Sequence, residues 1–569
     1  MDIQERTFAP SSALQLIRAG LNPVLARVLV SRGVLSPAEV QPQLDQLLPY
    51  STLTGAQEMA RILADAIQAG KRLLIVADYD ADGATACSVG LRALRGFGAN
   101  VDFIIPDRVE HGYGLSPAIA TIACSVSPKP DYIVTVDNGI ASHAGIAECN
   151  RLGVPVLVTD HHLPGETHPD ALCIVNPNQH GCAFASKALA GCGVMWYVMQ
   201  ALQDELFDRG VAFADREFDV AQLLPIVAVG TVADVVALDV NNRILVAEGL
   251  KRIRAGESFA GLNCLAQVAG KNTATLSTSD IGFGIGPRIN AAGRLQTMDA
   301  GVECLTTDSP ERAKELAASL HEINNLRKEI EGDIVEEAVR RLLTDVRPER
   351  FTAVLHGDDW HQGVIGIVAG RLKERIWRPT FILASGPSGE HKGSGRSIPG
   401  FHLRDALDMV DRRHPGLMLK FGGHAMAAGV TLRPGGVAEF AEAFEKVARE
   451  LLNPADLNQT LLVDGALETS EMSEAMVALI KHQVWGQAFP EPVFCDTFRV
   501  LEARSLSGGK HLRMTLEKEG RKFTAIKFQC TDSPPQPGTP VTVAYKLDVN
   551  NYRGETSIQL LVEAYQTLG

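Results

Sequence analysis

Four clusters of acidic and histidine residues punctuate the first half of the chain. Three of them follow short apolar runs directly, and the fourth ends an apolar segment with a helical pattern. Hard divalent cations prefer carboxylate oxygens, and an added imidazole favours Mn²⁺ over a pure Mg²⁺ site. Two such cations ~3.5–4 Å apart can hold the attacking and leaving oxygens of a phosphoryl transfer. We therefore predict a metal-dependent phosphoesterase site built from Asp78-Tyr79-Asp80-Ala81-Asp82-Gly83, Asp137-Asn138-Gly139, Asp160-His161-His162 and Gly230-Thr231-Val232-Ala233-Asp234.

Two other interpretations of these clusters were weighed. The first cluster has the D-x-D-x-D-G spelling of an EF-hand calcium loop, which requires a Glu at its twelfth position. Counted from Asp78, that position is Val89, and the preceding segment has a strand pattern, so the EF-hand is excluded. Any single Asp at a strand end is equally well explained as a helix or turn cap. Capping is a poor explanation for all four clusters together.

The apolar runs before three of the clusters predict strands of one parallel sheet. Residues 72–77, 132–136 and 155–159 are rich in β-branched side chains, and helical patterns lie between them. This alternation predicts a parallel sheet that is covered on both faces. Ligands of such sheets bind beyond the carboxyl ends of the strands, where the clusters fall. Asp137 would lie near the middle of the sheet, where a carboxylate can bridge two cations.

The fold class that we predict is α/β, with two α/β domains around a cleft and a C-terminal β-barrel. Short amphipathic helices are expected over residues 1–50, and the first α/β domain over 51–304. A long charged helix over 305–345, with Ser309-Pro310 near its start, connects it to a second α/β domain over 346–455. Residues 456–569 have the short strands and Gly- or Asn-containing turns of a small barrel of the OB type.

Composition narrows the classes of protein. No apolar run approaches the ~18 residues of a membrane span, and the first residues lack the apolar segment of a signal peptide. The ten Cys show no CxxC pair, which favours a reducing, cytoplasmic location over a disulfide scaffold. The net charge of −13 does not exclude a nucleic-acid partner. Binding depends on where the basic groups lie, and metal-binding carboxylates add to the acidic count.

The clusters and several later motifs resemble one known family. DYDADG, VDNG, DHH and GTVAD, in this order, resemble the DHH phosphoesterase superfamily, and WHQGVIGIVAGRL, GSGRS and FGGHAMAAG resemble its accessory DHHA1 domain. With PDRVEHGYG, GPRINAAGR and the barrel, the chain is similar over nearly its whole length to the RecJ family. This resemblance implies a 5′→3′ exonuclease for single-stranded DNA that uses a two-metal mechanism, releases mononucleotides and acts in recombination and repair.

The resemblance also implies roles for the matched residues. Asp82, Asp137, His161 and Asp234 would bind one Mg²⁺ or Mn²⁺ ion, and Asp80 and Asp137 the second. His162 would lie beside the scissile phosphate, and Asp160 would orient the neighbouring imidazoles. Many members of the superfamily have a His where this chain has Val76, so we expect a weaker metal site on the Asp80 side. Asp78 could substitute, although alternation along a strand argues against it.

A second set of residues would hold the nucleic acid. Two Gly-rich segments, 393–397 and 422–424, suit close approach to phosphates, although ordinary turns have the same composition. The resemblance assigns DNA contacts to Arg108, Tyr113, Arg288, Ser394, Arg396 and His424, with His361 and Arg371 as weaker candidates. In the barrel, basic and aromatic residues interleave as in a single-strand-binding OB-fold: Lys510, His511, Arg513, Lys522, Phe523, Lys527, Phe528, Tyr545, Lys546, Tyr552 and Arg553. For about half of them, a solvated basic face over an aromatic core explains the pattern equally well.

Two other functions were considered. A DHH phosphodiesterase acting on short oligonucleotides or cyclic dinucleotides would resemble the two α/β domains alone, without the N-terminal region and the barrel. A catalytically dead DNA-binding scaffold would have lost metal ligands, whereas this chain keeps all five. The expected partners are single-stranded DNA and, by resemblance only, the single-strand-binding protein and a RecQ-type helicase. No association with membranes is expected.

Overall fold

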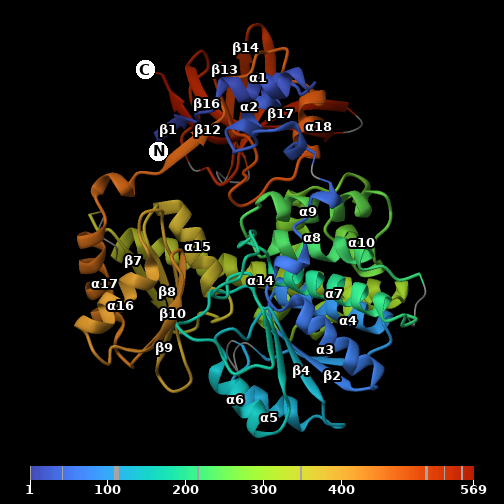
Figure 1. Ribbon diagram of the computed structural model, residues 1–569. Coiled ribbons are helices and arrows are strands. Elements are labelled where there is room, and N and C mark those ends of the chain that lie inside the picture. The colour runs from blue at the N-terminus through green and yellow to red at the C-terminus, as the bar shows by residue number, and fades with distance from the viewer. Residues whose placement is uncertain are drawn as a thin grey trace.

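The chain forms two α/β domains joined by one long helix, with a β-barrel lying over the first of them (Figure 1). The computed structural model describes residues 2–568 except 42, 108–113, 214–216, 346–348, 507–510, 531, 553 and 554. Within these residues, no helix is long and apolar enough to cross a membrane. The predicted fold class is confirmed.

The first domain is built on a five-stranded, wholly parallel sheet in the order β3-β2-β4-β5-β6. Side chains alternate between two separate cores, with Ile75 and Val134 in one and Val76 and Ile133 in the other. The strands are therefore apolar on both faces, as a sheet covered by helices requires. The bounds are β2 Arg72–Ala77, β3 Asn100–Ile104, β4 Tyr132–Val136, β5 Val156–Thr159 and β6 Cys173–Val175.

Helices cover both faces of this sheet and extend the domain beyond it. α3, α4 and α7 pack together on one side, and α5 packs with α6 on the other. A helical layer, α8 to α13, continues from the α4 and α7 side. The bounds are α3 Ala56–Gln68, α4 Ala81–Gly96, α5 Pro117–Ser125, α6 His143–Arg151, α7 Gly191–Asp208, α8 Leu224–Ala233, α9 Val240–Arg254, α10 Ala260–Val268, α11 Thr278–Asp280, η6 Ile281–Ile285, α12 Gly286–Leu295 and α13 Asp299–Thr306.

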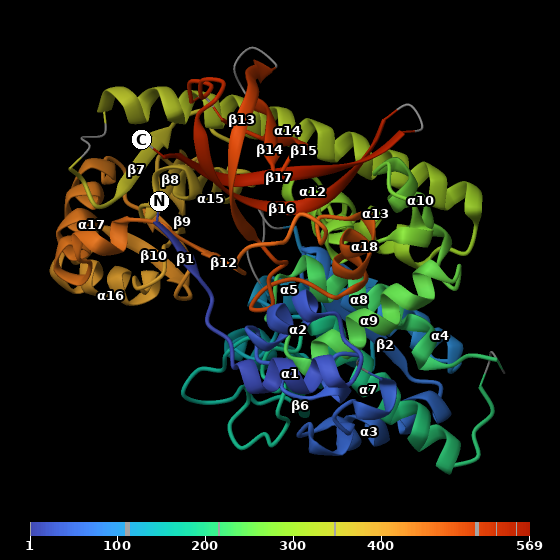
Figure 2. The ribbon, with the colours of Figure 1, turned by 90° about the horizontal axis from the view of Figure 1, so that it is seen from above.

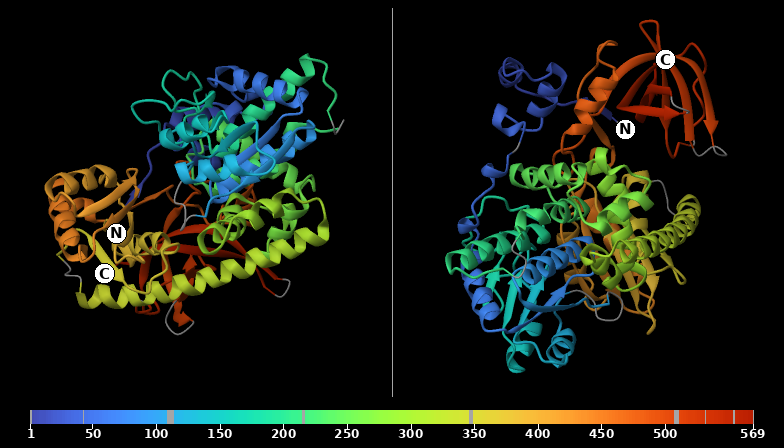
Figure 3. Two further views of the ribbon diagram at one scale, coloured as in Figure 1. Left: turned by 90° about the horizontal axis from the view of Figure 1, so that it is seen from below. Right: turned by 90° about the vertical axis from the view of Figure 1, so that its right-hand side faces the viewer.

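The connecting helix α14, Pro310–Asp345, spans 36 residues, or about 54 Å at 1.5 Å per residue. It packs against α10, α12 and α13 of the first domain and against α15 and β7 of the second, running along both (Figure 3). Pro310 occupies its first turn, as predicted, because the missing N–H has no partner there in any helix.

The second domain is a mixed sheet in the order β10-β11-β9-β8-β7. Its only parallel pair among the described strands is β7 with β8. Phe381, Phe440 and Phe444 form an edge-to-face aromatic core beneath it. The bounds are β7 Ala353–Gly357, α15 Ile365–Ile376, β8 Thr380–Ser385, β9 His391–Arg396, α16 Leu403–Arg413, β10 Met418–Gly423, β11 Ala427–Leu432 and α17 Val437–Leu451.

The C-terminal strands close into a barrel in the order β13-β14-β15-β17-β16. Closure gives each of these five strands two paired neighbours. A short helix and a strand precede it in the chain. The bounds are β12 Thr460–Val463, α18 Glu474–His482, β13 Phe494–Leu506, β14 His511–Lys518, β15 Arg521–Lys527, β16 Pro540–Tyr552 and β17 Glu555–Thr567.

The N-terminal region folds onto the C-terminal part of the chain, which the sequence did not indicate. The expected helices are present as α1, Pro10–Arg18, and α2, Pro23–Val30, but they follow a strand, β1, Asp2–Glu5. β1 pairs in parallel with β12 (Figure 2). Arg32 makes two contacts with Asp464, of 2.6 and 3.0 Å, and both side chains are almost wholly buried.

We expect Arg32→Ala to lower the free energy of unfolding by about 3–5 kcal/mol, because it leaves the Asp464 carboxylate buried without its cation. Denaturant unfolding followed by tryptophan fluorescence would measure the change, since Arg32 lies over the Trp485 ring. The matched control is Arg18→Ala, at an exposed position of α1. Equal unfolding midpoints for the two variants would contradict a structural role for the Arg32–Asp464 pair.

Candidate metal centre

Three neighbouring strands end level with one another and place the acidic clusters side by side. Ala77 of β2 pairs with Val136 of β4, which pairs with Thr159 of β5. The next residue of each strand is an aspartate: Asp78, Asp137 and Asp160. Their backbone N–H groups continue the ladder, donating to Val136, Thr159 and Val175 carbonyls over 3.0–3.3 Å. The predicted convergence at the carboxyl edge of the sheet is thus found in the structure.

The chain turns sharply at the middle strand so that the Asp137 carboxylate faces the other clusters. Asp137 has φ 61°, in the left-handed region that few side chains other than Asp and Asn adopt. The Asn138 amide donates to the Val76 and Val136 carbonyls and ties β2 to β4. Gly191, at the start of α7, leaves room for the carboxylate: an added Cβ would lie 2.7 Å from the Asp137 Oδ1.

Two helix starts hold the carboxylates of the first cluster. Asp80 caps α4, and its Oδ1 accepts from the N–H groups of Asp82 and Gly83. The Asp82 carboxylate accepts from the N–H groups of Gly191 and Cys192, over 2.6 and 2.9 Å. The positive end of α7 therefore stabilises a buried anion. Gly191 and Cys192 were not predicted, although the small residues of KALAGCGV before an apolar helix are a usable signal.

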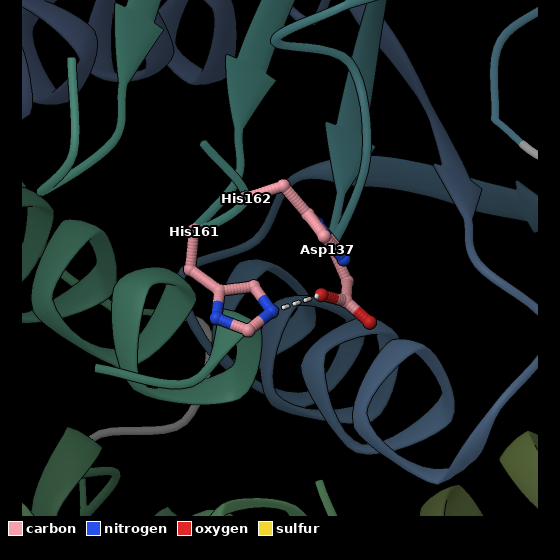
Figure 4. Close-up of side chains that lie close together, drawn as sticks. All are labelled: Asp137, His161 and His162. Carbon is pink, nitrogen blue, oxygen red and sulfur yellow. Dashed lines mark ion pairs between the residues drawn. The ribbon is translucent and has the colours of Figure 1, made fainter. Parts of the chain in front are cut away.

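His161 and Asp234 complete one side of the centre. The Nε2 of His161 lies 3.1 Å from the Asp137 Oδ1, and Figure 4 shows the ring edge turned toward that carboxylate. The same nitrogen lies 3.6 Å from an Asp234 oxygen and 3.9 Å from an Asp82 oxygen. Asp234 reaches this position from the C-terminal end of α8, which confirms the helix expected before the fourth cluster.

The side chains form overlapping groups that could each hold a cation. Ligand atoms of Asp82, His161 and Asp234 lie within 4.8 Å of one another. The same limit holds for Asp78, Asp80 and Asp137, and for Asp137 with His161 and His162. Asp137 lies between the groups, where a bridging ligand would be. Asp78 therefore does approach Asp80, whereas Val76 is buried in the core of the α5 and α6 face.

Burial and mutual repulsion dominate the electrostatics of the centre. Burial raises the pKa of Asp137 well above its usual range, and the charges of Asp82 and Asp80 raise it further. Burial and the same two carboxylates also raise the pKa of Asp234. Burial lowers the pKa of His161, which favours the neutral imidazole that binds metals. This set of carboxylate and imidazole donors fits hard divalent cations.

Asp160 has a different task from the other aspartates. It accepts from the N–H groups of Ile140, His161 and His162 and contacts the His162 Nδ1 at 2.8 Å. Although burial opposes it, the His162 hydrogen bond lowers the pKa of Asp160. Burial opposes protonation of His162 too, but Asp160 outweighs it and raises the pKa of His162 to about 9. Asp160 thus contacts the His162 imidazole directly, as expected, whereas it contacts His161 only through the backbone N–H.

His424 of the second domain lies across a cavity from His162 of the metal centre. A cavity of about 360 Å³ is lined by His162, Asp160 and the starts of α5 and α6 on one side and by His424 on the other. Arg396 of β9 pairs with Ala427 of β11, and the Ala427 carbonyl accepts from the His424 N–H. Ser394 and Arg396 hence lie at the same end of the sheet as His424. Gly366 of α15 makes room for both side chains.

Other predicted DNA contacts have different surroundings. Arg108 and Tyr113 lie outside the described residues. Arg288 is buried on α12, and its guanidinium donates to the Gly284 and Val268 carbonyls and to His321. This places it in packing between α12 and α14, and its contact with phosphate stays a prediction. Arg371 donates to Glu331 of α14, and the His361 ring accepts from the N–H of Gly363.

The barrel corrects part of the predicted stacking surface. Phe523 and Tyr545 are core residues, 2% and 0% exposed, because they lie on the inward face of their strands. Phe528 is 58% exposed and lies edge-on to His511 at 5.4 Å, as a base-stacking group would. Lys546 contacts Glu491 and Glu563. Lys510 and Arg553 lie outside the described residues.

Family models match three separate parts of the chain. They describe the DHH family, N-terminal domain (residues 72–231), the DHHA1 domain (349–450) and the RecJ OB domain (463–564). The single-stranded-DNA-specific exonuclease RecJ of Salmonella typhimurium is 44% identical over 560 residues, 96% of each chain. This chain belongs to the RecJ family. The RecJ of Thermus thermophilus is 34% identical, over 95% of this chain and 74% of that relative.

Solved RecJ structures share the fold. The crystal structure of RecJ in complex with Mn²⁺ from Thermus thermophilus has a TM-score of 0.83 at 30% identity. It is matched over 100% of this chain and 79% of that one. The complex of the same protein with Mg²⁺ has a TM-score of 0.78 at 28% identity, over 100% and 78% of the two chains.

We expect Gly191→Ala to reduce metal affinity and hydrolysis by about 10–100-fold, as loss of a supporting contact around a metal typically does. The added methyl group displaces the Asp137 carboxylate. Titration of Mn²⁺ by calorimetry separates this effect from misfolding. The control is Gly332→Ala in α14, where an added Cβ meets nothing within 4 Å. Unchanged Mn²⁺ affinity in Gly191→Ala would contradict the proposed role of the helix start.

Stability without metal should fall as the pH rises. The raised pKa values of Asp137 and Asp234 mean that the folded protein retains protons which the unfolded chain has released, so deprotonation favours unfolding. Divalent cations replace those protons and stabilise the folded state. We expect the increase in melting temperature caused by Mn²⁺ to be larger at about pH 8 than at about pH 5. A pH-independent increase, or an undiminished one in Asp137→Asn, would be the contrary result.

Proposed function

We propose that this protein is a metal-dependent exonuclease that degrades single-stranded DNA from the 5′ end and releases mononucleotides. The observation that carries the proposal is the set of overlapping carboxylate and imidazole groups, one member of which, His162, faces His424 across a cavity. RecJ relatives over the full length of the chain are single-stranded-DNA-specific exonucleases, and their solved complexes contain Mn²⁺ or Mg²⁺. The 5′→3′ direction rests on the family resemblance.

The first domain would hold the cations, and the second domain would position the substrate. Asp82, His161 and Asp234 would hold one cation, and Asp80 with Asp78 the second, with Asp137 shared. Such cations lower the pKa of water and neutralise charge on phosphoryl oxygens. His162, kept in position by Asp160, would donate a hydrogen bond to a phosphoryl oxygen as its negative charge increases. Ser394, Arg396 and His424 would position the substrate from the opposite sheet.

The shape of the cavity supports removal of one nucleotide at a time. Its volume of about 360 Å³ is near the lower limit of ligand sites, which run from about 300 to 1,000 Å³. Its walls combine apolar Leu115 and Ile140 with Ser116 and His143 at helix starts. A single terminal nucleoside would fill this space beside His162. The small-substrate alternative is not favoured, because the RecJ OB domain model matches residues 463–564 and a RecJ relative is similar over 96% of the chain.

Wider roles in the cell remain predictions. Cooperation with the single-strand-binding protein and with a RecQ-type helicase in recombination and repair rests on family resemblance. A cytoplasmic location is supported by ten free cysteines, as expected in a reducing compartment. Co-purification with each partner from cells, with and without nuclease treatment, would distinguish protein contacts from shared binding to DNA.

Digestion of single strands labelled at the 5′ or the 3′ end tests the proposed reaction. With Mg²⁺ or Mn²⁺, the 5′ label should appear at once as a mononucleotide, while the 3′ label stays on shortening strands. A chelator should stop both changes. Internal cleavage, early release of the 3′ label, or a strong preference for dinucleotides over long strands would overturn the proposal.

Asp137→Asn should lower hydrolysis by at least about a thousandfold while DNA binding changes little, because the bridging negative charge is lost and the phosphate contacts of the second domain remain. Steady-state rates and binding titrations in parallel measure the two effects. Asp131→Asn is the matched control, since Asp131 lies at the opposite end of β4, where it binds Lys71 and the Arg72 N–H. Near-normal hydrolysis by Asp137→Asn would exclude the bridging role.

A further inference from the structure

A second, larger cavity lies between the first domain and the barrel. It has a volume of about 740 Å³ and is lined by the end of α8, the η6 turn and, on the other side, α18 and the barrel strands β16 and β17. The barrel lies above α8 and α9 in Figure 1. Val235, which directly follows the metal-site residue Asp234, is part of the lining. We call this cavity the barrel groove.

The barrel groove carries an unusually exposed aromatic side chain. Phe283 is 84% exposed, whereas Ile281 and Ile285, two residues away on either side, are buried. All three belong to η6, a π-helical turn, and such turns recur at functional sites. Gly282 and Gly284 flank Phe283, so neither adjacent residue carries a side chain. A highly exposed aromatic ring on the wall of a cavity is suited to stacking with a planar ligand.

Val235 adds a second exposed apolar group beside the metal centre. It is 62% exposed and has φ 63°, a conformation that is rare and strained for a β-branched residue. Strain of this kind persists where the surrounding structure enforces it, and it is frequent at functional sites. Here it follows from the turn that brings Asp234 to His161 at the end of α8. The apolar lining of the groove therefore includes the residue next in the chain to a metal-site aspartate.

The charges in the barrel groove are already paired, which argues against a phosphate-binding surface. Lys271 contacts Asp280 at 2.7 Å and Lys481 contacts Asp548 at 2.5 Å. Lys546 lies 3.6 Å from Glu491. A lining of ion pairs, hydroxyl groups and exposed apolar side chains matches the faces and edges of nucleobases better than it matches a phosphate backbone. In a duplex, pairing and stacking hide those faces and edges.

We propose that Phe283 is a stacking platform for a base of the single strand as it passes from the barrel to the metal centre. This inference rests on the proposed function and names the positioning residue for the part of the strand that awaits cleavage. Phe283 binds the substrate outside the reacting atoms, so its loss should weaken binding of strands long enough to reach the groove and leave the rate at saturation almost unchanged.

Phe283→Trp provides a direct test that does not depend on hydrolysis. Stacking of thymine on the new indole should quench its fluorescence when an oligothymidylate is added in the presence of a chelator. The parent protein corrects for the four native tryptophans. Phe207→Trp is the matched control, because Phe207 is 78% exposed near the end of α7, outside the lining of the groove. Equal responses of the Phe283→Trp and Phe207→Trp variants would overturn the stacking role.

Kinetics with strands of increasing length separate stacking from a general structural role. Phe283→Ala should raise KM about tenfold for long single strands, with kcat nearly unchanged, and Phe283→Tyr should restore the parent KM. The defect should vanish for the shortest oligonucleotides, which end before the groove. A length-independent defect, or a loss confined to kcat, would overturn the inference. Failure of the parent protein to degrade single strands would instead refute the proposed function, while the fluorescence test would still report on Phe283.

Discussion

The central constraint in this structure is the repulsion between the buried carboxylates of the metal centre, which the protein offsets only in part. Asp78, Asp82 and Asp137 are buried at the ends of neighbouring strands and the start of a helix, where water cannot screen their charges. The N–H groups of Gly191 and Cys192 stabilise Asp82, and His161 approaches from the next strand. Divalent cations would relieve the rest. The same burial that destabilises the metal-free centre therefore strengthens its affinity for metals.

The metal centre is one half of a site whose other half belongs to a different sheet. The distance between His162 and His424 is set by how the second domain is fastened to α14. Glu331, in the middle of that helix, is buried and contacts both Arg327 of α14 and Arg371 of α15. A single stiff helix with a buried ion pair at the junction resists bending better than a flexible linker would. The side chains that we propose bind phosphate would thereby be held in place opposite the proposed cation sites.

The sequence predicted the convergence of the candidate metal ligands correctly where these directly follow strands. Strand, cluster and helix alternate, so the convergence of Asp137 and His161 followed from sheet topology alone. The alternation of side chains along a strand argued against Asp78 as a metal ligand. However, β2 ends at Ala77, so this alternation does not apply to Asp78, which lies close to Asp80 and Asp137. The pairing of β1 with β12 depends on contacts between distant segments, for which one sequence has no local signal. For Gly191, the run of small residues before α7 is a local signal, but its contact with Asp137 depends on the fold. Phe523 and Tyr545 look like surface aromatics until closure of the barrel decides which face is inside.

A chain with a net charge of −13 that acts on a polyanion must bind it through placement of groups rather than through overall attraction. A broadly basic surface would hold duplex and single strands alike, since both present the same phosphates. Here the lysines of the barrel groove are already paired with acids, and the phosphate contacts that we propose involve the metal centre and the strands that face it. Beyond those contacts, the groove would offer apolar surface for bases. Under this proposal only an unpaired strand could use that surface, so the pairing of the groove lysines would itself contribute to discrimination against duplex DNA.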